Sequence, residues 1–293
     1  MNVTRRAALG AIGAVALAGC GNGGRVAVGS KNFTEELLLG EMYAQVLEAH
    51  GIPVARRLNL GGTEIAMAAL QRGAIDLYPE YTGTGLLTVL KRPPLADANA
   101  IYETVKAAYR KDYALQWLRP SPMNDSQALG TTGPIAARYR IRTLSDLSRA
   151  APQLRLGAVP EFMHRPDALP GLQRVYGGFH FREVRLLDSG LKYHALLQGD
   201  VDVVVAFGTD GAVAADHVYL FEDDKHFWPA YHVAPVVRSS TLQAHPTIAR
   251  ELDRLAPFLT DAVMRDLNEQ IDGPQKREFE DVAFDFLKGH HLV

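Results

Sequence analysis

The feature that most constrains the fold is an internal repeat of one short α/β unit. Residues 69–85 (ALQRGAIDLYPEYTGTG) are echoed by residues 195–211 (ALLQGDVDVVVAFGTDG) at a constant offset. Each copy predicts the end of a helix, a glycine stop, a short apolar strand, and an aromatic residue that leads into a glycine-rich loop. The repeat therefore indicates two α/β lobes of similar build, with Tyr81 and Phe207 at the carboxyl edges of their sheets, where open α/β sheets bind ligands. A generic helix–glycine–strand joint would explain the shared glycine and aspartate, but less easily the aromatic residue at the same offset.

The pattern outside the repeat predicts that the chain crosses between the lobes twice. Strand-like runs and amphipathic helices alternate from residue 25 to residue 118, and the breaker-rich segment Arg119-Pro120-Ser121-Pro122 then leaves the first lobe. Residues 235–238 run back to it, and a helical tail follows. We therefore expect a two-lobed α/β fold, with lobe 1 formed by residues 25–123 and 233–293 and lobe 2 by residues 124–232. A ligand cleft between lobes joined in this way opens by a hinge motion.

Residues 1–19 are interpreted as an export signal. Arg5 and Arg6 precede a short apolar run that ends in Leu17-Ala18-Gly19-Cys20, a sequence that resembles the bacterial lipobox. Cys20 is the only cysteine of the chain and stands where that motif places its lipid. We expect cleavage before Cys20, a tether over residues 20–24, and a lipid-anchored protein in the periplasm or on the outer face of the cytoplasmic membrane. The paired arginines leave both the general secretory route and the twin-arginine route open.

Composition and missing motifs argue against several function classes. The chain has a formal net charge of −2 and no long basic tract, which argues against a nucleic-acid partner. It contains no phosphate loop, no HExxH motif, no serine-hydrolase elbow, and no thiol after the anchor position. His226 and His232 lie near Asp223 and Asp224, but the spacing is loose for a metal site, and a solvated turn is the simpler interpretation. We expect no catalytic residues, no metal and no other cofactor.

Aromatic residues gather at loop positions, and aromatic faces are what hold a quaternary ammonium group. Such a group has no N–H to donate, so π electrons must meet its charge. Four segments resemble, in order, the osmoprotectant-binding proteins of ABC uptake systems for glycine betaine, choline, carnitine and proline betaine: GSKNFTE at 29–35, DLYPEYTGT at 76–84, TDG at 209–211, and DDK at 223–225 followed by YxxAPVVR at 231–238. The resemblance extends over essentially the whole mature chain.

This resemblance implies a periplasmic-binding-protein fold of type II, with an aromatic cage for the trimethylammonium group of the ligand. Carried over by position, it takes one cage residue from lobe 1 and two from lobe 2, namely Tyr81, Phe207 and Tyr231. It places the ligand carboxylate near three polar side chains, namely Lys31, Thr84 and Arg165. It also implies a small-molecule osmolyte and the permease subunits of an ABC transporter as partners.

The position of Lys31 is independently suited to an anion. Lys31 follows a predicted strand and precedes a helix start at which Asn32 can cap and Glu35 can complete a capping box. A ligand carboxylate there would also meet the positive end of the helix dipole. Arg165 could clamp the same carboxylate from the opposite lobe and favour closure.

Each predicted site residue also has a purely structural interpretation. Tyr81 and Phe207 could pack in the core at the ends of their strands, and Arg165 could be an ordinary surface arginine. Tyr231 competes for its role with the aromatic residues at positions 227 and 228.

The chain departs from the family pattern at two cage positions. Gln127 stands where the family commonly has a tyrosine, and Phe207 also replaces a usual tyrosine. A desolvated cation–π contact contributes up to ~2 kcal/mol, so one missing wall would weaken binding by on the order of tenfold or more. We therefore count Gln127 among the ligand-contacting residues but expect a reduced cage, with low betaine affinity or a shifted ligand. A tyrosine at position 127 should tighten glycine betaine binding.

Together these features predict a lipid-anchored receptor that closes on a glycine betaine-like or choline-like osmolyte and presents it to a permease. It would catalyse no reaction. A receptor for another zwitterion, such as an amino acid, is an alternative, and so is an enzyme on the same two-lobed scaffold, because fold does not determine function.

Overall fold

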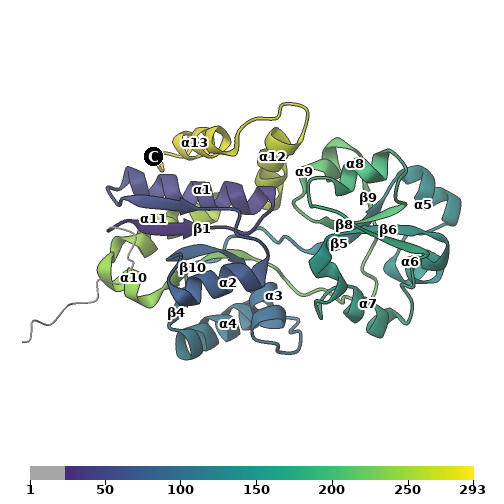
Figure 1. Ribbon diagram of the computed structural model, residues 1–293, viewed down its shortest axis with the longest axis horizontal. Coiled ribbons are helices and arrows are strands. Elements are labelled where there is room, and N and C mark those ends of the chain that lie inside the picture. Colours follow the sequence, from purple (N-terminus) through teal and green to yellow (C-terminus); the bar gives the residue numbers. More distant parts are fainter. Residues whose placement is uncertain (1–23) are drawn as a thin grey trace, which may run out of the picture.

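The computed structural model describes residues 24–293 and contains two five-stranded mixed sheets (Figure 1). The first sheet has the order β2-β1-β3-β10-β4, with bounds β1 Val26–Gly29, β2 Val54–Arg57, β3 Leu77–Tyr81, β4 Leu115–Trp117 and β10 Val233–Arg238. The second has the order β7-β6-β8-β5-β9, with bounds β5 Gln127–Thr131, β6 Arg155–Ala158, β7 Glu183–Leu186, β8 Val203–Phe207 and β9 Tyr219–Leu220. Lobe 1 and lobe 2 below are the bodies built around these two sheets. The predicted export signal and the anchor at Cys20 lie outside the described residues.

The two sheets share one topology. In each, the central strand pairs in parallel with one neighbour and antiparallel with the other: β3 with β1 and β10, and β8 with β6 and β5. β3 and β8 are the strands of the sequence repeat, so the repeat marks the same place in both sheets. The prediction of two α/β lobes of similar build is confirmed.

The repeated polar and glycine residues have matching roles in the two lobes. Asp76 Oδ2 accepts a hydrogen bond from a β1 amide, and Asp202 Oδ2 accepts one from a β6 amide, both at 2.8 Å. Each aspartate thereby ties the start of the central strand to its parallel neighbour. Gly73 and Gly199 precede these strands with φ values of 75° and 73°, a left-handed conformation that favours glycine.

Helices cover the sheets, and the C-terminal tail is also helical. Lobe 1 begins with α1 Thr34–Ala49, α2 Thr63–Arg72, α3 Thr82–Thr84 and α4 Ala98–Tyr113. Lobe 2 contains α5 Gly133–Tyr139, α6 Leu144–Ala150, α7 Leu169–Tyr176, α8 Lys192–Leu197 and α9 Gly211–Ala215. The tail forms α10 Ser239–Ala244, α11 Thr247–Leu255, α12 Asp261–Asp272 and α13 Phe279–Gly289, and three of these tail helices, α11 to α13, pack on α1. Within residues 24–293, no helix has both the length and the apolar character that a membrane span requires.

Each lobe has its own apolar core. Leu39, Met42 and Val237 belong to a fully buried cluster in lobe 1. Leu156 and Val205 belong to a separate one in lobe 2. The two clusters are separate apart from Trp228, which packs against both.

The start of α1 differs from the expected one. Its N-cap is Phe33, without a side-chain hydrogen bond, so the expected cap at Asn32 is wrong. Instead the carboxylate of Glu36 accepts a hydrogen bond from the Lys31 amide at 2.9 Å. An acid of the first helical turn thus stands at the positive end of the dipole, where a ligand carboxylate was expected.

Two segments, 118–126 and 221–232, join the lobes and bond to each other. Asn124 and His232 form an antiparallel bridge, and Asn124 Oδ1 accepts a hydrogen bond from the Tyr231 amide at 2.7 Å. The tail also reaches lobe 2, because α12 packs against α9 and Arg265 donates to the Gly208 carbonyl at 2.7 Å. Figure 1 shows α12 standing beside lobe 2, while α13 lies over lobe 1.

Candidate functional site

A cavity of about 540 Å³ lies between the lobes and is lined by residues of both. All of the residues predicted from the sequence line it, namely Lys31, Tyr81, Thr84, Gln127, Arg165, Phe207 and Tyr231. The fold thus brings together side chains that are far apart in the chain. Their contact with a ligand stays a prediction.

The aromatic residues next to Tyr231 have other surroundings. The rings of Phe227 and Trp228 lie 5.6 Å apart, and Trp228 Nε1 donates to the Asp167 carbonyl at 2.9 Å. Tyr231 is the member of this group that lines the cavity, with 2% of its surface exposed.

Three aromatic rings form a stack across the cavity. The centroid of Phe33 lies 6.3 Å from that of Tyr81 and 6.5 Å from that of Phe207, and the planes of Phe33 and Phe207 differ by only 4°. Phe33 therefore joins the aromatic residue of lobe 1 to that of lobe 2. The sequence-based prediction took Lys31 from residues 29–35 as a site residue and missed Phe33. The available signal was its place in a loop directly after a strand.

The chain places its own ammonium groups against both ends of this stack. Lys31 Nζ lies 4.6 Å from the centroid of Tyr81, and Lys192 Nζ lies 4.6 Å from that of Phe207. Both lysines are buried. These distances are those of cation–π contacts, so the rings already interact with positive charge. Lys192 is a second cavity residue that the sequence did not reveal, because its partners are distant in the chain.

Acidic side chains lie beside these lysines, buried glutamates at Lys31 and a partly exposed aspartate at Lys192. Lys31 Nζ lies 2.8 Å from Glu80 and 3.5 Å from Glu36, and Lys192 Nζ lies 2.8 Å from Asp210. Burial works to lower the pKa of Lys31, but the two glutamates outweigh it and hold that pKa above its ordinary value. Lys31 therefore stays charged in the cavity wall.

Arg165 is paired within its own lobe and also reaches the other. Its Nη2 and Nε lie 2.6 and 2.9 Å from the two carboxylate oxygens of Asp167. Nη2 also donates to Thr84 Oγ1 of lobe 1 at 3.3 Å. Burial opposes its charge, but Asp167 holds the pKa of Arg165 above its ordinary range. Arg165 thus links the lobes with its charge already balanced.

Gln127 and Tyr231 belong to the same network. Gln127 Nε2 donates to Asp167 Oδ2 at 2.8 Å, and the Tyr231 hydroxyl donates to the same oxygen at 2.7 Å. Burial works to raise the pKa of Asp167, but Arg165 and the Tyr231 hydroxyl hold it below its ordinary value. Gln127 is therefore a buried donor that helps to hold this carboxylate.

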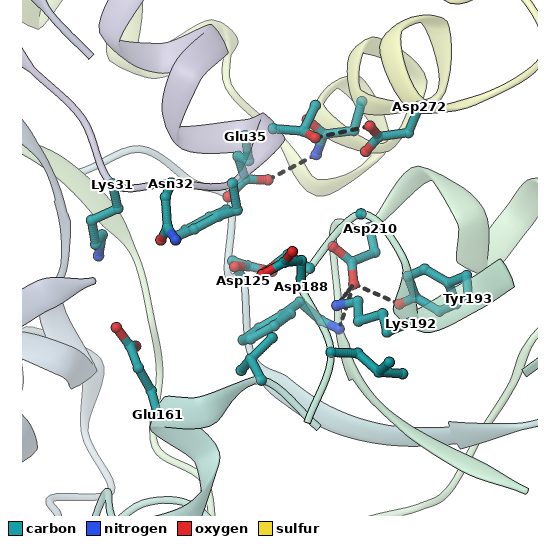
Figure 2. Close-up of a pocket in the computed structure, with 18 of the residues that line it drawn as sticks. Lys31, Asn32, Glu35, Asp125, Glu161, Asp188, Lys192, Tyr193, Asp210 and Asp272 are labelled. Atoms are coloured by element: carbon teal, nitrogen blue, oxygen red, sulfur yellow. Dashed lines mark hydrogen bonds and ion pairs between the residues drawn. The ribbon is translucent and has the colours of Figure 1, made fainter. Parts of the chain in front are cut away.

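Glu161 approaches lobe 1 from lobe 2. A Cβ on Gly62, the N-cap of α2, would lie 1.3 Å from Glu161 Oε1, so glycine leaves room for this carboxylate. Glu161 also lies 3.9 Å from Arg165 Nη1. Figure 2 shows Glu161 and Lys31 pointing toward each other from opposite sides of the cavity.

A second group of acids lies at the hinge end of the cavity (Figure 2). Glu35 accepts hydrogen bonds from the Tyr81 hydroxyl at 2.6 Å and from Asn268 Nδ2 at 3.0 Å. Asp125 accepts one from Thr209 Oγ1 at 2.7 Å. Burial raises the pKa of Glu35 to about 7, although the hydrogen bonds from Tyr81 and Asn268 oppose it.

The acids and histidines near position 223 have structural partners. Asp224 accepts a hydrogen bond from the Ser145 amide at 3.0 Å, and His232 Nδ1 lies 2.8 Å from the Met123 carbonyl. Within residues 24–293, no three His, Cys, Asp or Glu side chains group as metal ligands would.

Comparison with known proteins decides the family. Residues 24–289 match OpuAC, the substrate binding domain of ABC-type glycine betaine transport systems. This chain belongs to the OpuAC family. The predicted two-lobed fold and the predicted class of solute-binding receptor are thereby confirmed, since OpuAC proteins are the extracytoplasmic substrate-binding components of ABC transporters.

Relatives of this OpuAC protein are similar over most of its length. The glycine betaine-binding protein YehZ of Escherichia coli K12 is 35% identical over 275 residues, which cover 90% of each chain. The ergothioneine transport permease/ergothioneine binding protein EgtU of Helicobacter pylori G27 is 33% identical over 262 residues, or 89% of this chain. The chain spans only about half of that relative, 47% of its length. A solved structure of a glycine betaine/carnitine/choline ABC transporter gives a TM-score of 0.73 at 30% identity, covering 91% of this chain and 99% of the other.

Proposed function

We propose that this protein captures a quaternary-ammonium compatible solute in the cavity between its lobes and delivers it to the permease of an ABC transporter. The observation that carries the proposal is the stack of Tyr81, Phe33 and Phe207, whose end rings each have a lysine ammonium at 4.6 Å. Rings that hold one cation by cation–π attraction can hold another. A trimethylammonium group suits them because it needs no hydrogen-bond acceptor.

Contacts from both lobes favour closure on the ligand. The stack takes Tyr81 and Phe33 from lobe 1 and Phe207 from lobe 2, while Arg165 and Thr84 already bond across the cleft. A ligand that touches both walls binds the closed form more tightly than the open form, and this difference shifts the population toward closure. The permease would then meet a closed, loaded receptor.

Calorimetric titration of the full chain with a ligand panel tests the proposal. Glycine betaine, choline and carnitine should include at least one binder, whereas glycine and proline, which lack a quaternary ammonium, should not bind. A ligand at a hundred times its dissociation constant raises the free energy of unfolding by about 2.7 kcal/mol, so a thermal shift provides a second readout. Binding of an amino acid alone would support the alternative zwitterion receptor, and turnover of a methylated amine would support an enzyme.

A variant of Phe33 makes the same test specific to the ring stack. Phe33→Leu keeps apolar bulk but removes the π face, so the affinity for the bound quaternary ammonium should fall by roughly tenfold. Phe284→Leu is the matched control, because Phe284 is an exposed residue of α13 outside the cavity. Equal affinities of both variants and the wild type would contradict the role of the stack.

The size of the cavity favours a second candidate ligand, one that is larger than glycine betaine. Its volume of about 540 Å³ falls in the range of roughly 300–1,000 Å³ that is usual for drug-sized molecules, and glycine betaine is much smaller than these. The Helicobacter pylori relative is named as an ergothioneine binding protein, and ergothioneine is a trimethylammonium zwitterion with an additional ring. Tighter binding of ergothioneine than of glycine betaine in the same panel would support this candidate.

Anchoring and the lobe boundaries complete the proposal. The lipobox-like sequence at Cys20 supports a lipid anchor, and Cys20→Ser should release the protein from the membrane fraction. The bridge between Asn124 and His232 supports lobe boundaries at 123/124 and 232/233. Retention of the Cys20→Ser protein in the membrane would argue against the anchor.

A further inference from the structure

Three cations of the cavity wall, two of them buried and one partly buried, are already paired within the chain. Each has a carboxylate partner at 2.6 to 2.8 Å: Lys31 with Glu80, Lys192 with Asp210, and Arg165 with Asp167. Lys276 also lines the cavity, but it lies at the exposed rim and donates to a backbone carbonyl of its own segment. A ligand carboxylate inside the cavity would therefore have to compete with these internal partners.

Two buried carboxylates of the same cavity have no cationic partner among the described residues. Asp125 is 6% exposed and receives hydrogen bonds only on Oδ1, from the amide and hydroxyl of Thr209. Glu35 is 4% exposed and is held by two neutral donors, the Tyr81 hydroxyl and the Asn268 amide. The hinge end of the cavity thus has a surplus of acidic groups and of acceptor atoms.

Asn268 adds an unpaired acceptor to this group. It is 2% exposed and lines the cavity, and none of residues 24–293 donates to its Oδ1. Its amide orientation is determined, because Nδ2 lies between two acceptors, Glu35 Oε2 at 3.0 Å and the Thr209 carbonyl at 2.9 Å. A buried carbonyl oxygen without a donor costs free energy. Because Oδ1 has almost no accessible surface, only a ligand group that enters between Asn268 and the two acids could supply that donor.

The acids of this region repel one another. Burial and then the nearby charges of Glu35 and Asp210 raise the pKa of Asp125 well above its ordinary value. Asp210 likewise contributes to the raised pKa of Glu35. A positive ligand would relieve this repulsion, whereas a second carboxylate would add to it.

We propose that Glu35, Asp125 and Asn268 form an acceptor subsite for an O–H or N–H group of a cationic ligand. The inference rests on the proposed function, because the neighbouring ring stack would hold the quaternary ammonium of the same molecule. The cleft accordingly prefers quaternary ammonium ions that carry a hydrogen-bond donor, such as choline, over betaines that carry none, such as glycine betaine. The carboxylate of a betaine would have to face the acids or displace a paired cation.

Three ligands, tested on the wild-type full chain, separate the contributions of the positive charge, the hydrogen-bond donor and the carboxylate to binding. Choline carries a charge and a donor, tetramethylammonium carries the charge alone, and glycine betaine carries the charge with a carboxylate. Calorimetry should give choline the highest affinity, with glycine betaine weaker by on the order of tenfold. Glycine betaine binding as tightly as choline would overturn the inference and leave the proposed function standing, as would equal affinities for choline and tetramethylammonium. If no quaternary ammonium ion binds, both the inference and the proposed function are overturned.

The variant Asp125→Asn tests the subsite directly. Its amide oxygen can still accept from Thr209, so the exchange removes the charge and replaces the free acceptor Oδ2 with a donor. Choline affinity should fall by roughly tenfold, while glycine betaine affinity should stay equal or rise. Asp112→Asn, at an exposed acid of α4, is the matched control and should leave all affinities unchanged. An equal loss of choline and glycine betaine binding would overturn the inference, and the wild-type comparison decides it even if the variant does not fold.

Discussion

At the scale of single residues, the cavity side chains are tied to internal partners. Gln127 is one example: it donates to Asp167, which also binds Arg165 and the Tyr231 hydroxyl. Asp167 would therefore remain paired if the amide of Gln127 were lost. By comparison with the family pattern, Gln127 leaves the cage without one aromatic wall. In this structure, its side chain is a hydrogen-bond donor to Asp167.

The exchange Gln127→Tyr tests which of these roles matters more for binding. We expect glycine betaine affinity to rise by on the order of tenfold, because a new ring would face the cavity while Asp167 keeps two other donors. Gln127→Leu separates the two effects, since it removes the amide without adding a ring. Calorimetric affinity that is unchanged or weaker in Gln127→Tyr would contradict the idea of a reduced cage.

At the scale of elements, the close packing of α9 on α12 connects lobe 2 to the tail. A Cβ on Gly211, the first residue of α9, would lie 2.4 Å from the backbone nitrogen of Glu269 in α12. Gly85, its counterpart in the repeat, is confined by side chains, with Trp117 at 2.8 Å from such a Cβ. Both repeated glycines therefore allow a close approach rather than a special backbone conformation.

Gly211→Ala should accordingly destabilise the protein. Because the obstructing atoms are backbone, the helices must separate, and the free energy of unfolding should fall by about 1–3 kcal/mol in urea titrations. Gly133→Ala is the control, since a Cβ there would meet no atom within 4 Å. If both variants unfold at the same urea concentration as the wild type, α9 and α12 are less tightly packed than described.

At the scale of the whole molecule, buried acids make stability depend on pH. Burial raises the pKa of Glu36 from 4.5 to about 8, against the opposing charge of Lys31 and with the added repulsion of Glu80. Burial likewise raises the pKa of Glu35 from 4.5 to about 7. The folded state therefore keeps protons that the unfolded chain releases near pH 4.5, so rising pH favours unfolding across this window.

We expect the free energy of unfolding of the ligand-free protein to decrease from pH 5 to pH 8. A shift of the size found for Glu35 corresponds to on the order of 3 kcal/mol. Glu36→Gln should flatten the profile measured by urea unfolding, whereas Glu64→Gln, at an exposed residue of α2, should not. Stability that rises steadily from pH 5 to pH 8 would contradict this assignment of the protons.

The sequence by itself determined the elements, the two lobes and the class of protein. Apolar periodicity, glycine stops and the repeat around Tyr81 and Phe207 are local signals, because a helix or a strand depends mainly on neighbours a few residues away. The repeat placed Tyr81 and Phe207 at the edges of their sheets, and the resemblance to the osmoprotectant-binding family supplied the other predicted site residues. The fold brought all of them to one cavity.

Only the tertiary structure decided how the charges of that cavity are balanced. Lys31 pairs with Glu80, 49 positions away, and Asn268 bonds to Glu35, 233 positions away. Phe33, the N-cap of α1, belongs to the ring stack, whereas the sequence suggested Asn32 as the cap and gave Phe33 no role. Ion pairs and ring contacts depend on distances of a few ångströms between distant segments, and local sequence patterns carry no record of those distances.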